Sequence, residues 1–238
     1  IHLPLLLNSD KSKLSKRQGD VSVKDYIEKG YLSEAMINFI ALLGWHSSNN
    51  DEIFSLNKLK KEFSLKRIQK SGAIFDVQKL NWLNSKYLIN MPLEQVVNLV
   101  KPLFIKNSMD VSDNSKLLLA VDNARKRVNT ISQIVDESIM FYQELELDSQ
   151  NYTIIKNNQS QSIINDLVKR CKNNNLIEGE EFKNLIVQIG EEKKIKGKDL
   201  FFPVRIALYG NTHGPDLPII FSILGYSESL KRLQKYVR

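Results

Sequence analysis

The protein is a chain of 238 residues, of which 42% are hydrophobic and 26% are charged. These proportions exclude a disordered chain, and no apolar run approaches the roughly 20 residues that a membrane-spanning helix needs. The single cysteine, Cys171, excludes an internal disulfide, and three histidines beside it disfavour a metal centre. We therefore expect a protein of a reducing compartment, most simply the cytoplasm, that has no membrane association.

The net charge is +7, from 34 Lys and Arg against 27 Asp and Glu. This excess fits a phosphate-rich partner and fits an ordinary solvated surface equally well. The ten glycines form neither a dinucleotide-binding motif nor a Walker phosphate loop, and the nucleophile-elbow and zinc-protease motifs are absent from the sequence. A free-standing enzyme should show such a constellation, so we expect a part of a longer protein.

The first third of the chain predicts a small unit that is mostly helical. Residues 1–7 read as a short buried strand, and a polar loop with four basic residues follows as far as Gly19. Ser33 is a candidate N-cap for a helix whose core stripe would be Met36, Ile37, Ile40 and Leu43. We expect helices over 21–28, 34–43, 57–63 and from residue 75 onward, with a short extended piece over 51–54.

The rest of the chain predicts helices only. A polar stretch over 148–160 reads as a linker. We expect helices over 93–104, 115–144, 163–171, 180–189, 203–209, 217–224 and 230–237. The predicted fold class is therefore mainly α, with domains at 1–91 and 92–238, the second divided into subdomains of about 92–148 and 160–238.

The most informative string is Lys13-Leu14-Ser15-Lys16-Arg17. Two lysines and an arginine on a short loop after a strand form a mobile cationic finger. Lysine ammonium groups act as point charges on phosphates, and they can stabilise charge that shifts during phosphoryl transfer. Ser15 adds a hydroxyl, and Gly19 could serve as a hinge. Taken alone, a string of this kind is more often a solvated basic turn.

The string resembles the KMSKS signature of class I aminoacyl-tRNA synthetases, in the form found in the glutamyl and glutaminyl branch. Three further stretches resemble bacterial glutamyl-tRNA synthetase in the same order, at 31–45, 75–87 and 196–225. The match is weak only over about 110–178. The resemblance implies the C-terminal part of such an enzyme. It would have a stem-contact-type domain with short strands and then an all-helical anticodon-binding cage in two subdomains.

The resemblance also implies an activity for the full-length enzyme, which ligates glutamate to tRNA(Glu) with ATP through a glutamyl-adenylate. Lys16 would contact ATP and stabilise the departing pyrophosphate, Lys13 and Ser15 would share the catalytic role, and Leu14 and Arg17 would complete the ATP-binding loop. Mg²⁺ would accompany ATP. The family's nucleotide-binding fold, with its HIGH-like motif and glutamate pocket, lies before this loop. We therefore expect the chain on its own to be an inactive monomer.

Anticodon bases are single-stranded and can be read along their pairing edges. The resemblance implies that Arg205, Gly214, Pro215 and Leu217 line the anticodon pocket and that Arg127 meets the third anticodon base. A slip in register would place Arg125 there instead, and residues 125–127 could equally be a solvated face. Other residues have simpler interpretations: Trp82 and Tyr87 as core, His213 as a turn residue, and Cys171 as a buried apolar residue.

Three alternatives stay open at this point. The glutaminyl branch shares the loop signature but has a β-barrel anticodon module, whereas residues 92–238 predict helices. A short paralogue that modifies a tRNA base lacks the helical cage. The third alternative is a basic helical nucleic-acid-binding or interaction module with no synthetase role. The sequence also leaves open whether tRNA(Gln) is a second partner.

Overall fold

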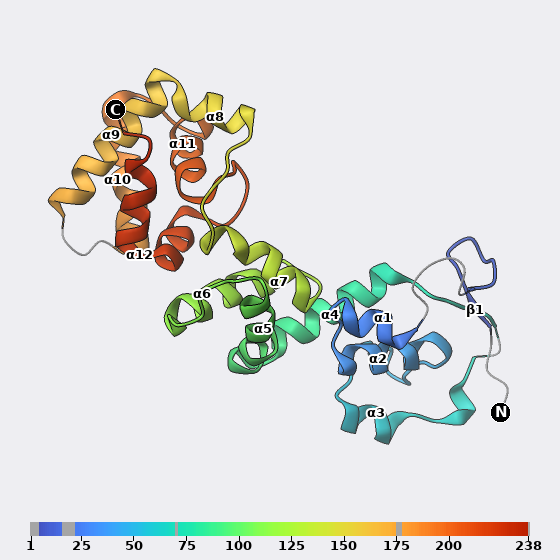
Figure 1. Ribbon diagram of the computed structural model, residues 1–238. Coiled ribbons are helices and arrows are strands. Elements are labelled where there is room, and N and C mark those ends of the chain that lie inside the picture. Colours follow the sequence, from blue (N-terminus) through green and yellow to red (C-terminus); the bar gives the residue numbers. More distant parts are fainter. Residues whose placement is uncertain (1–4, 16–21, 70, 175–177, 238) are drawn as a thin grey trace. The chain divides into compact units, whose positions relative to one another are not determined.

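The computed structural model describes residues 5–15, 22–69, 71–174 and 178–237, and 66% of it is helical (Figure 1). The described strands are two residues long each and pair in parallel, with Leu6 opposite Ala73. The expected mainly α fold with short strands is therefore confirmed. None of the described helices is long and apolar enough to cross a membrane.

The chain forms two compact units, each assembled from separate stretches of sequence. The first unit contains residues 1–107 and 124–137, and the second contains residues 108–123 and 138–238. The helix over 114–125 therefore belongs mostly to the second unit, although its last residues pack with the first. The domain boundary at residues 91–92 stays a prediction.

The first unit is built around a pair of packed helices, α2 and α4. Its core contains Tyr26, Met36, Phe39, Leu80 and Leu83. Helix α4 begins where the sequence predicts, because the Asp76 carboxylate accepts the amide hydrogens of residues 78 and 79. The elements of this unit are β1 (Leu6–Leu7), α1 (Val23–Glu28), α2 (Ser33–Gly44), α3 (Leu56–Glu62), η2 (Leu65–Arg67), β2 (Ala73–Ile74), α4 (Val77–Asn90), α5 (Leu93–Lys106) and most of α7 (Ile131–Ser138).

Several expectations for the first unit are wrong in detail. The strand is not buried, since Leu6 is 38% exposed, and residues 1–4 lie outside the described part. Helix α2 has Leu32 at its N-cap position, with no side-chain cap from Ser33. Two residues of the expected core stripe, Ile37 and Ile40, are 43% and 47% exposed.

A polar residue explains the shift of the α2 face. Asn38 is buried because its amide group bonds the extended segment beside it, donating to the Glu52 carbonyl at 3.0 Å and accepting from the Phe54 amide at 2.8 Å. A stripe drawn from apolar residues alone misses such a position. The expectation of a core Trp82 is also wrong, as this side chain is 39% exposed. Tyr87 is half-buried, and its hydroxyl donates to the side-chain oxygen Oδ1 of Asn38.

The second unit packs its helices around one large apolar core. Phe182 and Phe221 stack within it at a ring-centroid distance of 4.3 Å. Cys171 is buried as expected, and burial raises the pKa of its thiol to about 11. The elements are most of α6 (Asn114–Arg125), η3 (Ile139–Phe141), α8 (Ser149–Lys156), α9 (Asn158–Asn173), α10 (Gly179–Lys193), α11 (Lys198–Tyr209) and α12 (Leu217–Gln234).

The predicted long helix over 115–144 is wrong, because the chain breaks after α6 and starts again at α7. The Gln133 side chain accepts from the amides of Asn129 and Thr130, which caps the new start. The predicted linker over 148–160 is also wrong. Its polar residues are helix caps: Asp148 caps α8 and Asn157 caps α9.

The end of the predicted helix 217–224 coincides with a kink, but the predicted gap before residue 230 is wrong, because residues 226–229 are helical. Helix α12 runs from Leu217 to Gln234 but is kinked at Gly225, where φ is +73° and the backbone leaves helical geometry. A residue with a side chain is strained at such a φ, so glycine is the residue that permits this kink.

Candidate functional site

The basic loop after β1 folds back as a short hairpin. Leu7 and Lys13 form an antiparallel bridge, and the Leu14 amide donates to the Leu6 carbonyl at 2.9 Å. Lys11 occupies the turn with φ at +66°. The loop therefore has defined backbone pairing as far as Leu14, and Lys13 is held beside β1.

Side chains fix the tip of this hairpin. The Asp10 carboxylate accepts from the Ser12 hydroxyl at 2.6 Å and from the Ser12 amide at 2.9 Å, and these bonds lower the pKa of Asp10. Such a turn stabilises the loop locally, because the aspartate takes the place of a backbone acceptor. The described part of the expected cationic finger is thus an ordered, hydrogen-bonded turn.

Three of the expected ATP-contacting residues, which are consecutive in the chain, lie in the described part of the loop. Lys13 is exposed, and its ammonium forms no ion pair with any residue that the structure describes. Leu14 and Ser15 are half-buried next to it. Lys16 and Arg17, the other two members, lie outside the described residues. The loop can therefore offer the Lys13 ammonium as one point charge to an anionic group.

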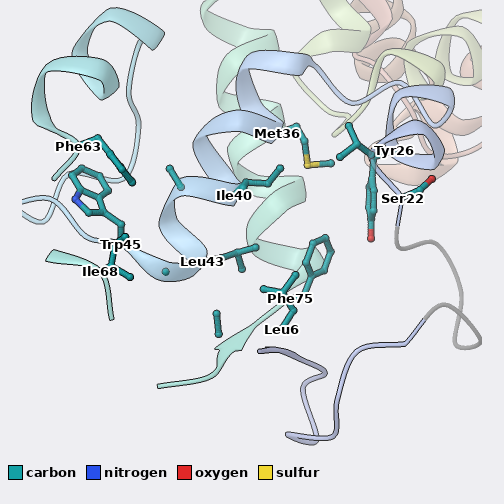
Figure 2. Close-up of a pocket in the computed structure, with 14 residues that line it drawn as sticks. Leu6, Ser22, Tyr26, Met36, Ile40, Leu43, Trp45, Phe63, Ile68 and Phe75 are labelled. Carbon is teal, nitrogen blue, oxygen red and sulfur yellow. The ribbon is translucent and has the colours of Figure 1, made fainter. Parts of the chain in front are cut away.

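An apolar concavity of about 420 Å³ lies within the first unit, among β1, α1, α2 and the strand β2 (Figure 2). Leu6 lies beside Phe75 at one end, and Trp45 and Phe63 lie together at the other. Among the described residues that line it, the only polar side-chain groups are the Ser22 and Tyr26 hydroxyls and the Trp45 ring nitrogen. The described part of this surface offers no cation to a phosphate, so contacts to ATP phosphates would have to come from the basic loop.

The expected anticodon residues of the second unit meet at the end of α11. The Arg205 Nη1 donates a long hydrogen bond, 3.3 Å, to the Gly214 carbonyl. Gly214 has φ at +145°, and a Cβ there would come within 2.5 Å of the Tyr209 ring. The loop from residue 210 to 216 therefore lies close against α11, and only glycine allows this approach.

The two remaining members of this group have buried side chains. Pro215 is buried, and Leu217 is 3% exposed within the large core. Any contact to a base would therefore come from backbone groups beside them and from Arg205. Arg205 is half-buried, and its Nε has no hydrogen-bond partner among the described residues. His213, as expected, belongs to the turn, where its amide donates to the Asn211 side chain.

The third-base candidate, Arg127, belongs to the first unit and lies in the turn after α6. Its Nη2 lies 2.8 Å from the Glu137 carboxylate, and the side chain stays partly exposed. Arg125, the alternative, donates from Nη1 to the Met91 carbonyl at 2.7 Å in a part-buried position. The structure thus gives Arg125 a structural contact and leaves Arg127 at the surface.

The sequence patterns missed one charged cluster. Arg232 is 5% exposed, and its guanidinium bonds Glu228 and three backbone carbonyls. The i, i+4 spacing of Glu228 and Arg232 was the available signal. No group of three or more His, Cys, Asp or Glu side chains that could hold a metal ion occurs within the described ranges.

Two family models match the chain. The anticodon binding domain matches residues 95–237, and the catalytic domain of class I tRNA synthetases (E and Q) matches residues 1–82. The first covers the whole group around Arg205, and the second covers the basic loop. Between the two matches lie residues 83–94, which contain the end of α4 and the beginning of α5.

The similar proteins described next are all glutamate–tRNA ligases. A glutamate–tRNA ligase of Carboxydothermus hydrogenoformans is 37% identical over 98% of this chain, and one of Alkaliphilus metalliredigens is 39% identical over all of it. Among solved structures, a glutamate–tRNA ligase of Elizabethkingia meningosepticum superposes with a TM-score of 0.88 at 29% identity over 99% of this chain. In each case the chain spans about half the length of the protein it matches.

Proposed function

Because the chain belongs to the glutamate–tRNA ligase family and contains its anticodon-binding domain, we propose that it is the tRNA-binding portion of such an enzyme. The full-length enzyme would ligate glutamate to tRNA(Glu) with ATP, through a glutamyl-adenylate. The observation that carries the proposal is the anticodon-domain match over residues 95–237, which spans α5 to α12.

The geometry around Arg205 supports anticodon binding. The half-buried Arg205 guanidinium, whose buried Nε has no hydrogen-bond partner among the described residues, lies beside a loop that Gly214 allows to approach α11 closely. A guanidinium presents several donors in a rigid fork and suits a base edge with acceptors. Gly214, Pro215 and Leu217 would supply backbone groups to a base, and Arg127 would meet the third anticodon base.

The loop after β1 would serve the chemical step of the full-length enzyme. Lys16 and Lys13 would place positive charge near the phosphates of ATP, and Ser15 would add a hydroxyl, with Leu14 and Arg17 completing the loop. Charge placed beforehand where negative charge develops lowers the barrier of phosphoryl displacement. Mg²⁺ would enter with ATP and be held by its phosphates. The Lys13 ammonium, exposed and with no ion-pair partner among the described residues, fits such a role.

The test of the proposal is tRNA binding by this chain. We expect a tRNA(Glu) transcript to bind with an affinity that falls steeply as salt rises, because Lys and Arg contacts to phosphates release counterions. Footprinting should show protection of the anticodon loop. Arg205→Ala should weaken binding and reduce that protection, with fluorescence anisotropy as the measure of affinity.

The matched control is Arg170→Ala, which removes a guanidinium from the same unit that is already paired with Glu192. It should bind like the wild-type chain. Circular dichroism of each variant separates a lost contact from a lost fold, since Arg205 also bonds the Gly214 carbonyl. Protection confined to the acceptor end, or no binding at any salt concentration, would contradict the proposal.

A further inference from the structure

A second concavity, of about 300 Å³, lies wholly within the second unit. Its wall comes from the segment after η3, from the last turns of α12, and from Lys116 on α6 and Ala207 on α11. Four cations line it against two carboxylates. The charged lining residues are Lys116, Lys231, Arg232, Lys235, Glu144 and Glu228.

Arg232 builds a fixed positive charge into this wall. Its Nε donates to Glu228 at 2.9 Å, and its Nη1 donates to the carbonyls of Leu208 and Met140 at 2.7 and 2.9 Å. Nη2 donates to the Gln143 carbonyl at 3.1 Å. These bonds fix the guanidinium in place. Toward a ligand it would therefore hold the wall of the concavity in position and add positive electrostatic potential.

The other cations differ in their pairing. Lys231 lies 3.6 Å from Glu228, which Arg232 already uses, and Lys235 lies 3.3 Å from Glu144. Lys116 forms no ion pair with any described residue. Its half-buried ammonium lies 4.5 Å from the centre of the Tyr142 ring. A ring face attracts a cation but leaves its N–H donors unused.

The surroundings of Lys116 disfavour its charged form. Burial is the main cause that lowers the pKa of its ammonium, and repulsion from Arg232 adds to it. Glu228 and two aspartates on the approach to α6, Asp110 and Asp113, oppose this shift only in part. An anion in the concavity would relieve both effects, because an opposite charge favours the charged form of a lysine.

The charge of the whole second unit shows that this cluster is local. The unit contains 15 Lys and Arg and 15 Asp and Glu, so it has no net charge. A general positive field cannot account for cations gathered in one concavity. The cluster is therefore suited to one anionic group more than to a broad surface.

We propose that this concavity binds one phosphate group of the tRNA backbone, with Lys116 as the direct ligand and Lys231 and Lys235 at the rim. The inference rests on the proposed function, since all the lining residues fall within the anticodon-domain match. Lysine binds a phosphate as a point charge and needs no fixed geometry. A backbone phosphate contributes affinity and orientation and carries no base specificity.

The test compares Lys116→Met with the wild-type chain in binding a tRNA(Glu) transcript across roughly 50 to 200 mM salt. Loss of one phosphate contact should reduce the slope of log affinity against log salt by about 0.7–0.9, and it should weaken binding roughly tenfold at the lower salt. The melting temperature should stay equal or rise, because the variant removes a repelled, half-buried charge. Lys183→Met, on the exposed face of α10, is the control and should leave the slope unchanged.

Each other outcome has a clear meaning. An unchanged slope in Lys116→Met overturns the inference and leaves the proposed function standing. Absence of tRNA binding by the wild-type chain overturns both. Equal losses of tRNA affinity and of salt slope in Lys116→Met and Lys183→Met would show a general electrostatic effect, which contradicts a specific site in the concavity. A parallel titration uses inorganic phosphate alone. If phosphate binding requires Lys116 but the salt slope for tRNA is unchanged in Lys116→Met, the assignment to the tRNA backbone is overturned.

Discussion

Arg125 and Arg127 are two residues apart and have different surroundings. Arg125 donates to the carbonyl of Met91, the residue that ends α4, so it ties α6 to that helix end. Arg127 lies beyond the helix and pairs with Glu137 across the turn into α7. A surface ion pair of this kind contributes little stability and can be exchanged for a ligand contact. Of the two, Arg127 is the better candidate for reading a base.

We expect Arg127→Gln to narrow the preference of the chain for the glutamate anticodon over the glutamine anticodon. The two differ at the third base, C against G, and a good base contact contributes about 1–3 kcal/mol of discrimination. The measurement is the ratio of affinities for tRNA(Glu) and tRNA(Gln) transcripts. The ratio should fall at least threefold, which corresponds to about 0.7 kcal/mol.

Arg125→Gln is the matched variant for this experiment. It should lower thermal stability, because the Met91 carbonyl loses its donor, while the anticodon preference stays as in the wild type. If instead the preference changes with Arg125→Gln and stays with Arg127→Gln, the two positions have been assigned in the wrong register.

Arg232 adds polar links to the apolar packing that holds helix α12 against α10 and α11. Among the described residues, Arg232 is the only Lys, Arg, Asp or Glu that is buried. It joins the end of α11, through the Leu208 carbonyl, to the segment after α7, through Met140 and Gln143. One side chain thus satisfies backbone acceptors from two separate parts of the chain, in a position that the helix pattern alone would assign to a leucine.

We expect Arg232→Met to lower the free energy of unfolding by about 3–5 kcal/mol, since it leaves buried carbonyls and a carboxylate without their partner. Urea denaturation followed by circular dichroism measures this loss. Arg170→Met removes only an exposed pair with Glu192 and should cost below about 1 kcal/mol. Similar losses in the two variants would mean that the Arg232 contacts are replaced by water.

The positive charge of the molecule belongs entirely to the first unit. That unit contains 19 Lys and Arg against 12 Asp and Glu, whereas the two kinds are equal in the second. Long-range attraction of a nucleic acid would therefore arise from the first unit. The second unit would contribute short-range contacts, around Arg205 and in the concavity beside Lys116.

For the chain as a whole, we expect no glutamate-dependent ATP–pyrophosphate exchange. Only residues 1–82 match the catalytic domain, and they supply the basic loop. A loop of cations stabilises charge but does not bind glutamate or orient it for attack. The exchange assay with purified chain measures this directly. Exchange above that of a Lys16→Ala variant would show that the catalytic fold is more complete than the match indicates.

The sequence predicted elements whose signals are local. The Asp76 cap of α4, the break at Gly225 and the buried Cys171 depend on neighbouring residues or on composition, so they could be predicted without tertiary contacts. The loop motif and the motifs around Arg205 identified the family for the same reason. Such motifs are short strings of residues, so they identify a family without any knowledge of the tertiary structure.

Other features were missed although their signals are local, and one depends on residues that are distant in the sequence. Gln133 ends the apparent helix over 115–144 by capping a new start, and Asp148 and Asn157 turn an apparent linker into two helices. Each of these caps is formed within four residues, but a polar residue is equally compatible with an exposed loop, so the polar pattern alone did not distinguish the two. The cluster of Lys116 and Arg232 arises because α6 and α12, about ninety residues apart in the sequence, line the same concavity. Burial and charge at that site depend on which helices pack together, and the apolar pattern of one helix does not specify its neighbour.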